Sequence, residues 1–226
     1  MTALPVWVDL LAMGANGFFA AAIARHRGFP VYGTLFAGVL VGLGGGMVRD
    51  VLLGLEPVAI AEWYFIPAVI LASVVGALTF SRVVAMPRPA LVVSGIAWGL
   101  LIGIGVQKGL DQDVPALSAI FLGVLTASAG GIIVEAMARV RATVVRQAHW
   151  TATALVLGSA AFWAVSVTIG FWPAVVAGVV VTAVLRVVSV ERDWASPMWP
   201  GQTRAETSGD DPAPEEEEEQ RNADAR

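Results

Sequence analysis

Seven apolar segments recur along the chain, and each is close to the length needed to cross a bilayer. A membrane-spanning helix needs about 20 predominantly apolar residues. Short polar or turn-forming stretches separate the segments, among them RHRGFP, SRVVAMPRP and RVRATVVRQ. The predicted spans are residues 5–24, 31–54, 63–80, 90–108, 116–138, 150–168 and 173–190. The pattern therefore predicts an all-α membrane protein with seven transmembrane helices.

Composition agrees with a membrane protein and narrows the chemistry. Of 226 residues, 57% are hydrophobic and 14% are charged, well away from the composition of a soluble domain. Cysteine is absent, which excludes disulfides, thiolate metal sites and cysteine nucleophiles. His26 and His149 are far apart in sequence, so we expect neither a metal site nor a cofactor. No basic patch interleaves with aromatic residues, and we therefore expect no nucleic-acid partner.

Charged residues between the spans alternate in sign from one side of the membrane to the other. One side receives the arginines Arg25, Arg27, Arg82, Arg88, Arg139, Arg141, Arg146, Arg186 and Arg192. The other side receives Lys108 with the acidic residues Glu56, Glu62, Asp111 and Asp113. The positive-inside rule places the arginine side in the cytoplasm. The sequence thus predicts a plasma (inner) membrane protein with its N-terminus outside and its C-terminus cytoplasmic.

The end of the chain has a different composition from the apolar body. Residues 203–226 carry nine acidic residues and three arginines, leaving the body with eleven basic and nine acidic residues. Such a segment cannot bury a core. We predict that residues 203–226 form a disordered, acidic cytoplasmic tail.

The first half of the chain matches the second half at an offset of 85 residues. The pairs are Phe36 with Phe121, Gly38 with Gly123, Val39 with Val124, Leu40 with Leu125, Gly45 with Gly130, Gly46 with Gly131, and Asp50 with Glu135. Each copy holds three predicted helices, an odd number, so the copies must enter the membrane from opposite sides. The predicted domains are two inverted repeats, residues 1–85 and 86–170, followed by a seventh helix at 171–192.

Glycine clusters occupy equivalent positions in the two copies. Gly44, Gly45 and Gly46 lie in the second predicted helix, and Gly130 and Gly131 lie in the fifth. Glycine costs about 1 kcal/mol relative to alanine inside a helix. We therefore predict that both helices break there and expose carbonyl oxygens to a passing cation. The alternative is close helix packing, which we favour for the scattered glycines Gly17, Gly38, Gly76, Gly95, Gly103 and Gly123.

Charged residues follow both glycine clusters within about one turn. Asp50 could attract cations while Arg49 orients it, or the two could form an interfacial pair in which Arg49 reaches outward. Glu135 is the counterpart of Asp50, and its simpler role is to pair with Arg139 four residues on. Lys108, at the end of the fourth helix, is either an interfacial anchor or a positive charge that raises the barrier for a cation.

Two polar residues of the first predicted helix complete the candidates. We expect Asp9, one turn into that helix, to lie at the membrane interface. Asn16 lies deeper, where it could line a polar cavity or bond to another helix.

The motifs GLGGGMVRDVLLG, IGVQKGL and LGVLTASAGG resemble those of the prokaryotic trimeric intracellular cation (TRIC) channel family, whose domain is also labelled glycine transporter. The resemblance covers residue 8 to about residue 167. It implies a homotrimer in which each protomer has one pore for monovalent cations, potassium above all. It also implies that Gly44–Gly46 and Gly130–Gly131 are kinks in pore-lining helices, with Arg49, Asp50 and Lys108 as the family's charged residues. The second motif departs from the family pattern, with Ala129, Val134 and Glu135 in place of glycine, arginine and aspartate.

Three functions remain open at this point. The leading hypothesis is a passive channel that prefers potassium, surrounded by membrane lipids. A secondary transporter of a small neutral amino acid such as glycine is the alternative, because broken helices also suit a zwitterion. A membrane scaffold without transport activity is the third. The sequence shows no nucleophile elbow and no metal-ligand cluster, so we expect no enzyme activity.

Overall fold

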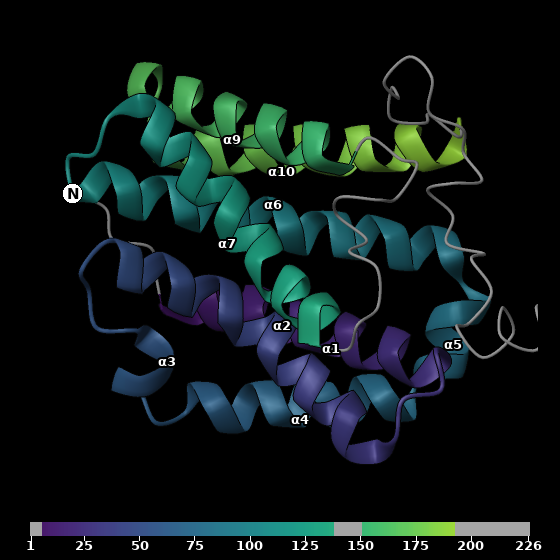
Figure 1. Cartoon of the computed structure of the whole chain (residues 1–226). Helices are drawn as coiled ribbons and strands as arrows, with labels where there is room; N and C mark the ends of the chain where they lie inside the picture. Colours follow the sequence, from purple (N-terminus) through teal and green to yellow (C-terminus); the bar gives the residue numbers. More distant parts are fainter. Residues whose placement is uncertain (1–5, 138–150, 193–226) are drawn as a thin grey trace, which may run out of the picture. The chain divides into compact units, whose positions relative to one another are not determined.

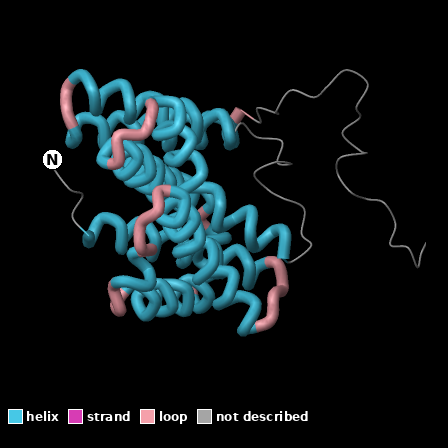
Figure 2. The backbone as a smooth tube through the Cα atoms, turned by 60° about the vertical axis from the view of Figure 1, so that its left-hand side comes forward, coloured by secondary structure: helices cyan, strands magenta, loops and turns pink. Residues whose placement is uncertain are grey.

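The described part of the chain is a bundle of helices. The computed structural model describes residues 6–137 and 151–192, apart from the side chains of residues 84, 87 and 135–137. All regular secondary structure in these residues is helical (Figures 1 and 2). The helices are α1 Val6–His26, α2 Val31–Leu52, α3 Val58–Ala61, α4 Phe65–Leu78, α5 Phe80–Ala85, α6 Pro87–Asp111, α7 Ala116–Met137, α9 Thr151–Thr168 and α10 Phe171–Glu191.

Six of these helices are long and apolar enough to cross a membrane. They are α1, α2, α6, α7, α9 and α10, which confirms six of the seven predicted spans with shifted ends. The third predicted span, residues 63–80, differs. Its helix α4 has 14 residues, about 21 Å at 1.5 Å per residue, which is short of a hydrocarbon core about 30 Å thick.

The third predicted span is divided at Thr79. The Thr79 hydroxyl donates a hydrogen bond to the Val75 carbonyl oxygen at 2.7 Å, a contact that bends helices. Thr79 has φ −97° and ψ 10°, outside regular helix geometry, and α5 begins at the next residue. The hydropathy pattern could not show this division, because it is a departure of the backbone from helix geometry at Thr79 inside an apolar segment.

Helix contacts form two groups of three. Helices α1, α2 and α4 pack on one another, as do α6, α7 and α9. The groups meet where α2 packs against α7 and α1 against α6, and α10 lies along α6 and α9. Figure 1 shows α4 at one side of the bundle and α9 with α10 at the other.

Small residues allow the helices to approach closely. A Cβ built on Gly38 would lie 2.5 Å from Ser73 Oγ, and one on Gly17 would lie 3.0 Å from the Gly38 carbonyl oxygen. Cβ atoms on the other scattered glycines, Gly76, Gly95, Gly103 and Gly123, would likewise meet atoms of neighbouring helices. The packing interpretation of these scattered glycines is confirmed.

Two ion pairs identify the ends of the bundle. At one end, Lys108 near the C-terminus of α6 pairs with Asp50 near the C-terminus of α2. At the other end, Arg88 near the N-terminus of α6 pairs with Glu191, the last residue of α10, at 3.3 Å. We call these the Lys108 end and the Arg88 end.

Candidate ion pathway

The glycine clusters do not break their helices. α2 runs without interruption through Gly44, Gly45 and Gly46, and α7 runs through Gly130 and Gly131. Within residues 6–137 and 151–192, positive φ angles occur at Gly28, Gly54, Gly170 and Asp113, all outside these helices. The prediction of two unwound helices with exposed carbonyl oxygens is therefore wrong.

The clusters instead mark the place where α2 and α7 touch. A Cβ on Gly130 would lie 2.7 Å from the carbonyl oxygens of Leu40 and Val41, and one on Gly44 would lie 3.2 Å from the Gly130 Cα. A Cβ on Gly45 would overlap the Thr126 carbonyl group. Tertiary packing offsets the low helix propensity of glycine, as it often does.

Gly131 is an exception to this packing. Among the residues that the structure describes, no atom outside the adjoining part of α7 lies within 4 Å of the place where its Cβ would be. Its repeat counterpart, Gly46, is instead covered by the Met13 side chain. The two clusters are thus equivalent in sequence but not in surroundings.

Four charged side chains from three long helices meet at the Lys108 end: Asp9, Arg49, Asp50 and Lys108. We call them the charge cluster. Asp9 lies in the first turn of α1, Arg49 and Asp50 lie near the end of α2, and Lys108 lies near the end of α6. An anion near a helix N-terminus and cations near helix C-termini suit the helix dipoles.

Asp50 is the most connected member of the charge cluster. Its Oδ1 accepts hydrogen bonds from Arg49 Nε at 2.8 Å and from Lys108 Nζ at 3.0 Å. Its Oδ2 accepts from the Val58 backbone N–H at 3.2 Å, at the start of α3. The short helix α3 therefore helps to hold this carboxylate in place.

Asp9 is less tightly held than Asp50. Its Oδ2 lies 3.7 Å from Arg49 Nη2 and 4.0 Å from Lys108 Nζ. Its Oδ1 is buried and has no hydrogen-bond partner among the described residues, and the same holds for Nη1 and Nη2 of Arg49. Buried polar groups are nearly always hydrogen-bonded, so this part of the cluster has unused capacity to bind water or an ion.

Burial decides between the earlier alternatives for these residues. Arg49 is 0% exposed and Asp50 is 1% exposed, so Arg49 does not reach outward as an interfacial residue would. Asp9 is 5% exposed, so its side chain faces the other helices of the bundle, and its position at the membrane interface stays a prediction. The Lys108 side chain is 23% exposed, which makes it the member of the cluster most open to the surroundings.

A second set of polar contacts crosses the middle of the bundle. Asn16 Nδ2 donates to the Val41 carbonyl oxygen at 3.1 Å, and Trp98 Nε1 donates to Asn16 Oδ1 at 3.1 Å. The guanidinium of Arg186 lies over the Trp98 ring, with its Cζ 3.7 Å from the centroid. Asn16 therefore bonds to other helices, one of the two roles predicted for it.

Sequence reasoning missed the position of Arg186. The charge pattern groups Arg186 with the loop arginines, but the residue lies inside α10. The sequence does indicate a position inside a helix, because Arg186 lies within an apolar run, five residues before Glu191. Glu135 lies in α7, but its side chain and its proposed partner Arg139 fall outside the described residues.

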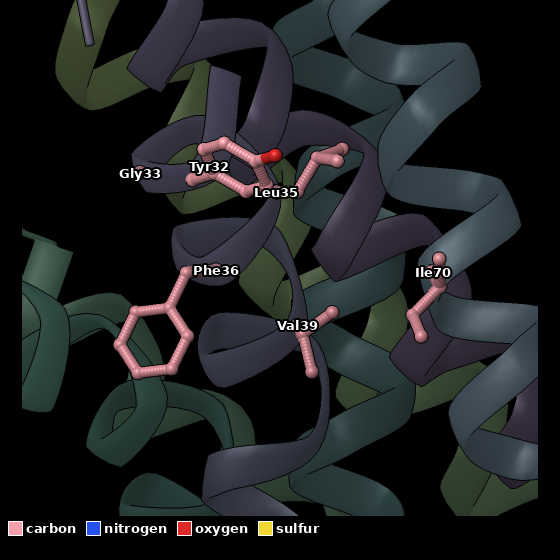
Figure 3. A pocket seen from close by; sticks show the side chains of 6 residues that line it. All are labelled: Tyr32, Gly33, Leu35, Phe36, Val39 and Ile70. Atoms are coloured by element: carbon pink, nitrogen blue, oxygen red, sulfur yellow. The ribbon is translucent and has the colours of Figure 1, made fainter. Parts of the chain in front are cut away.

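One groove on the bundle has no polar character. Tyr32, Gly33, Leu35, Phe36, Val39 and Ile70 line an open depression of about 550 Å³ on α2 and α4 (Figure 3). No charged residue lines it. Such a surface faces lipid in a membrane protein, so the charge cluster is the stronger candidate for an ion site.

A family model described as Glycine transporter matches residues 6–80 and 91–167. The chain belongs to this family. The two-part match leaves a gap within residues 81–90, where α5 meets α6. It agrees with the division of helix contacts into two groups of three.

Curated relatives of the chain are membrane proteins from bacteria. The UPF0126 inner membrane protein YadS of Escherichia coli K12 is 28% identical over 198 residues, which cover 83% of this chain and 92% of YadS. A UPF0126 membrane protein of Deinococcus radiodurans is 25% identical over 190 residues, with 83% and 88% coverage.

Solved structures with the same fold are TRIC cation channels. One matches with a TM-score of 0.77 at 21% identity and covers 88% of this chain and 98% of that channel. The TRIC orthologue from Rhodobacter sphaeroides matches with a TM-score of 0.72 at 24% identity, with 83% and 97% coverage. At these identities the likeness establishes the shared fold.

Proposed function

We propose that this chain is a passive channel for monovalent cations, with potassium preferred, and that it acts as a homotrimer in the bacterial inner membrane. The observation that carries the proposal is the fold match to TRIC channels, which extends over 97–98% of those chains. The location of YadS in the inner membrane supports the same location here. The proposed orientation keeps the N-terminus outside, the acidic tail in the cytoplasm and lipid around the bundle.

The proposed architecture is two inverted repeats with an additional helix. α1, α2 and α4 would form the first copy, and α6, α7 and α9 the second, with α10 as the seventh span. The pairing of α2 with α7 across the two groups supports this arrangement. The repeat-related glycine clusters would then lie at the interface between the copies, where they permit close contact.

The proposed pathway passes the charge cluster and not a pair of unwound helices. Asp9 and Asp50 would attract a cation at the Lys108 end, and Arg49 would hold Asp50 in position. The Lys108 ammonium lies 3.0 Å from Asp50 and 4.0 Å from Asp9. It would therefore occupy the position between the two carboxylates that a monovalent cation would take. A cation would pass when Lys108 moves aside, which its partial exposure permits.

Gly44, Gly45, Gly46, Gly130 and Gly131 keep a place in the proposed pathway, although not as helix breaks. Their small size brings the backbones of α2 and α7 together. A slight separation of these helices would open a passage beside Gly131, whose Cβ position has no described atom of another helix within 4 Å. Glu135, one turn further along α7, stays a candidate of the proposed pathway as the repeat counterpart of Asp50.

Transport measurements on the purified full chain in liposomes test the proposal. We expect potassium flux along its gradient without any second substrate, and we expect Asp50→Asn to reduce it several-fold. Saturable uptake of labelled glycine without potassium flux would instead support the transporter that the family description suggests. Absence of both activities, with normal assembly, would support the scaffold.

The number of subunits can be measured separately. Light scattering coupled to size-exclusion chromatography, corrected for bound detergent, should give three copies of the chain. A stable monomer that conducts potassium would refute the trimer and leave the channel assignment intact.

A further inference from the structure

Within residues 6–137 and 151–192, Arg186 differs from Arg49 and Lys108 because it has no acidic partner. Arg49 pairs with Asp50 and Asp9, and Lys108 pairs with the same two carboxylates. Among the residues that the structure describes, no carboxylate lies within ion-pair distance of Arg186, and its Nε is buried without a hydrogen-bond partner. Its guanidinium lies over the face of the Trp98 ring.

The guanidinium points toward the interior of the bundle. Arg186 stands five residues before the end of α10, about 8 Å along the helix axis. Trp98 stands eleven residues after the start of α6, about 16 Å from the same end. Because side chains tilt toward the N-terminus of their own helix, Arg186 leans away from the Arg88 end and toward the Trp98 ring.

Neighbouring helices hold this arrangement in place. The Trp98 indole N–H donates to Asn16 Oδ1, and Asn16 in turn donates to the Val41 carbonyl oxygen. A Cβ on Gly95 would lie 3.7 Å from Arg186 Cδ, so α6 leaves room for the arginine stem. The Arg186 residue is partly buried and its Nε is fully buried. Such a charge is costly in a membrane helix and usually functional, and a cation–π contact offsets only part of that cost.

We propose that Arg186 is a fixed positive charge that limits cation flow and makes it unequal in the two directions. The inference rests on the proposed channel function. The charge cluster has two cations and two anions and adds no net charge at the Lys108 end. Among the described residues, Arg186 has no acidic partner, so it adds one positive charge per protomer in the other half of the bundle. Because it is partly buried, this charge is screened less than a fully exposed one. Cations that enter from the Arg88 end therefore meet the larger repulsion.

Single-channel recordings in symmetric potassium chloride test the proposal. Arg186→Gln should raise the unitary potassium current on the order of threefold and make currents at positive and negative voltage more nearly equal. Arg186→Lys keeps the charge and should keep the unequal currents. Arg88→Gln is the matched control, since it removes a positive charge from a side chain that is 84% exposed and should change the current much less.

A second pair of variants neutralises Arg186 without removing it. Val190 lies one turn further along α10 and is 40% exposed. A carboxylate four residues after an arginine can pair with it on a helix. Val190→Glu should therefore reproduce the effect of Arg186→Gln, and Val190→Gln should leave the current as it is in the wild type. This pair decides the question if Arg186→Gln fails to fold.

The outcomes separate this inference from the proposed function. Wild-type current with no change in Arg186→Gln or Val190→Glu would overturn the role of Arg186 and leave the channel assignment in place. Equal changes in Arg186→Lys and Arg186→Gln would also overturn it, because they would indicate a packing effect and not a charge effect. Absence of wild-type current would remove the proposed function and this inference together.

Discussion

Lys108 Nζ and Asp50 Oδ1 lie 3.0 Å apart although 58 residues separate them in sequence. The contact joins the C-terminal ends of α6 and α2, and it places the most exposed cation of the charge cluster against its most buried carboxylate. If Lys108 occupies a cation site, its removal should free that site for potassium.

Replacement of Lys108 by methionine should therefore increase potassium flux into liposomes. Methionine keeps much of the stem volume and removes the charge, so we expect an increase on the order of fivefold. A flux assay with a potassium-sensitive dye measures this increase. Arg88→Met serves as the control, because it removes a cation outside the cluster. Unchanged or lower flux in Lys108→Met with intact assembly would contradict the proposed role of Lys108.

Arg49 should contribute strongly to stability. Its side chain is 0% exposed and lies between Asp50 and Asp9. Removal of one partner from a buried ion pair costs about 3–5 kcal/mol, so Arg49→Met should lower the thermal unfolding midpoint in detergent. The double variant with Asp50→Asn should recover part of the loss, since fewer charges remain unpaired. Equal stability of the single variant and the wild type would show that Arg49 is solvated and not buried.

Gly130 and Gly131 form a matched pair for testing the helix contact. Gly130→Ala should destabilise the protein by about 1–3 kcal/mol, because its Cβ would lie 2.7 Å from two carbonyl oxygens of α2. Gly131→Ala should be neutral, because no described atom of another helix lies within 4 Å of its Cβ position. Thermal stability followed by size-exclusion chromatography distinguishes them. The reverse order would mean that α7 packs through Gly131.

Gly45 and Gly46 test the same contact from α2. A Cβ on Gly45 would overlap the Thr126 backbone, whereas one on Gly46 would meet the flexible end of Met13. Gly45→Ala should therefore reduce the yield of folded protein more than Gly46→Ala, since backbone cannot move aside as a methionine side chain can. Fluorescence-detected chromatography of tagged variants measures the yield. A greater loss for Gly46→Ala would argue against close contact of Gly45 with Thr126.

The absence of native cysteine makes the proposed orientation simple to test. Gln112→Cys, in the exposed turn between α6 and α7, should react with a membrane-impermeant maleimide in intact cells. Ser208→Cys, in the acidic tail, should react only after the inner membrane is opened. Labelling in the opposite order would invert the proposed topology, and labelling of both in intact cells would place both segments outside.

The sequence by itself determined the number and placement of the apolar segments. The length of an apolar segment is a local property, and it decides whether the segment can span a bilayer. It also identified Arg49, Asp50 and Lys108 as candidates, since charge inside an apolar run is visible without a structure. The short third span was not predictable in the same way, because it depends on the backbone conformation of the single residue Thr79.

Only the tertiary structure decided what the glycines and the charges do. Glycine has the same weak helix propensity whether it unwinds a helix or lets two helices touch, so the choice depended on the neighbour, and the neighbour of Gly44 is Gly130. The roles of Asp9 and Arg186 also depend on their neighbours. Asp9 lies in the charge cluster beside Arg49, and Arg186 lies over the Trp98 ring and not in a loop. Partners distant in sequence fix the energy of a buried charge, and the fold alone brings those partners together.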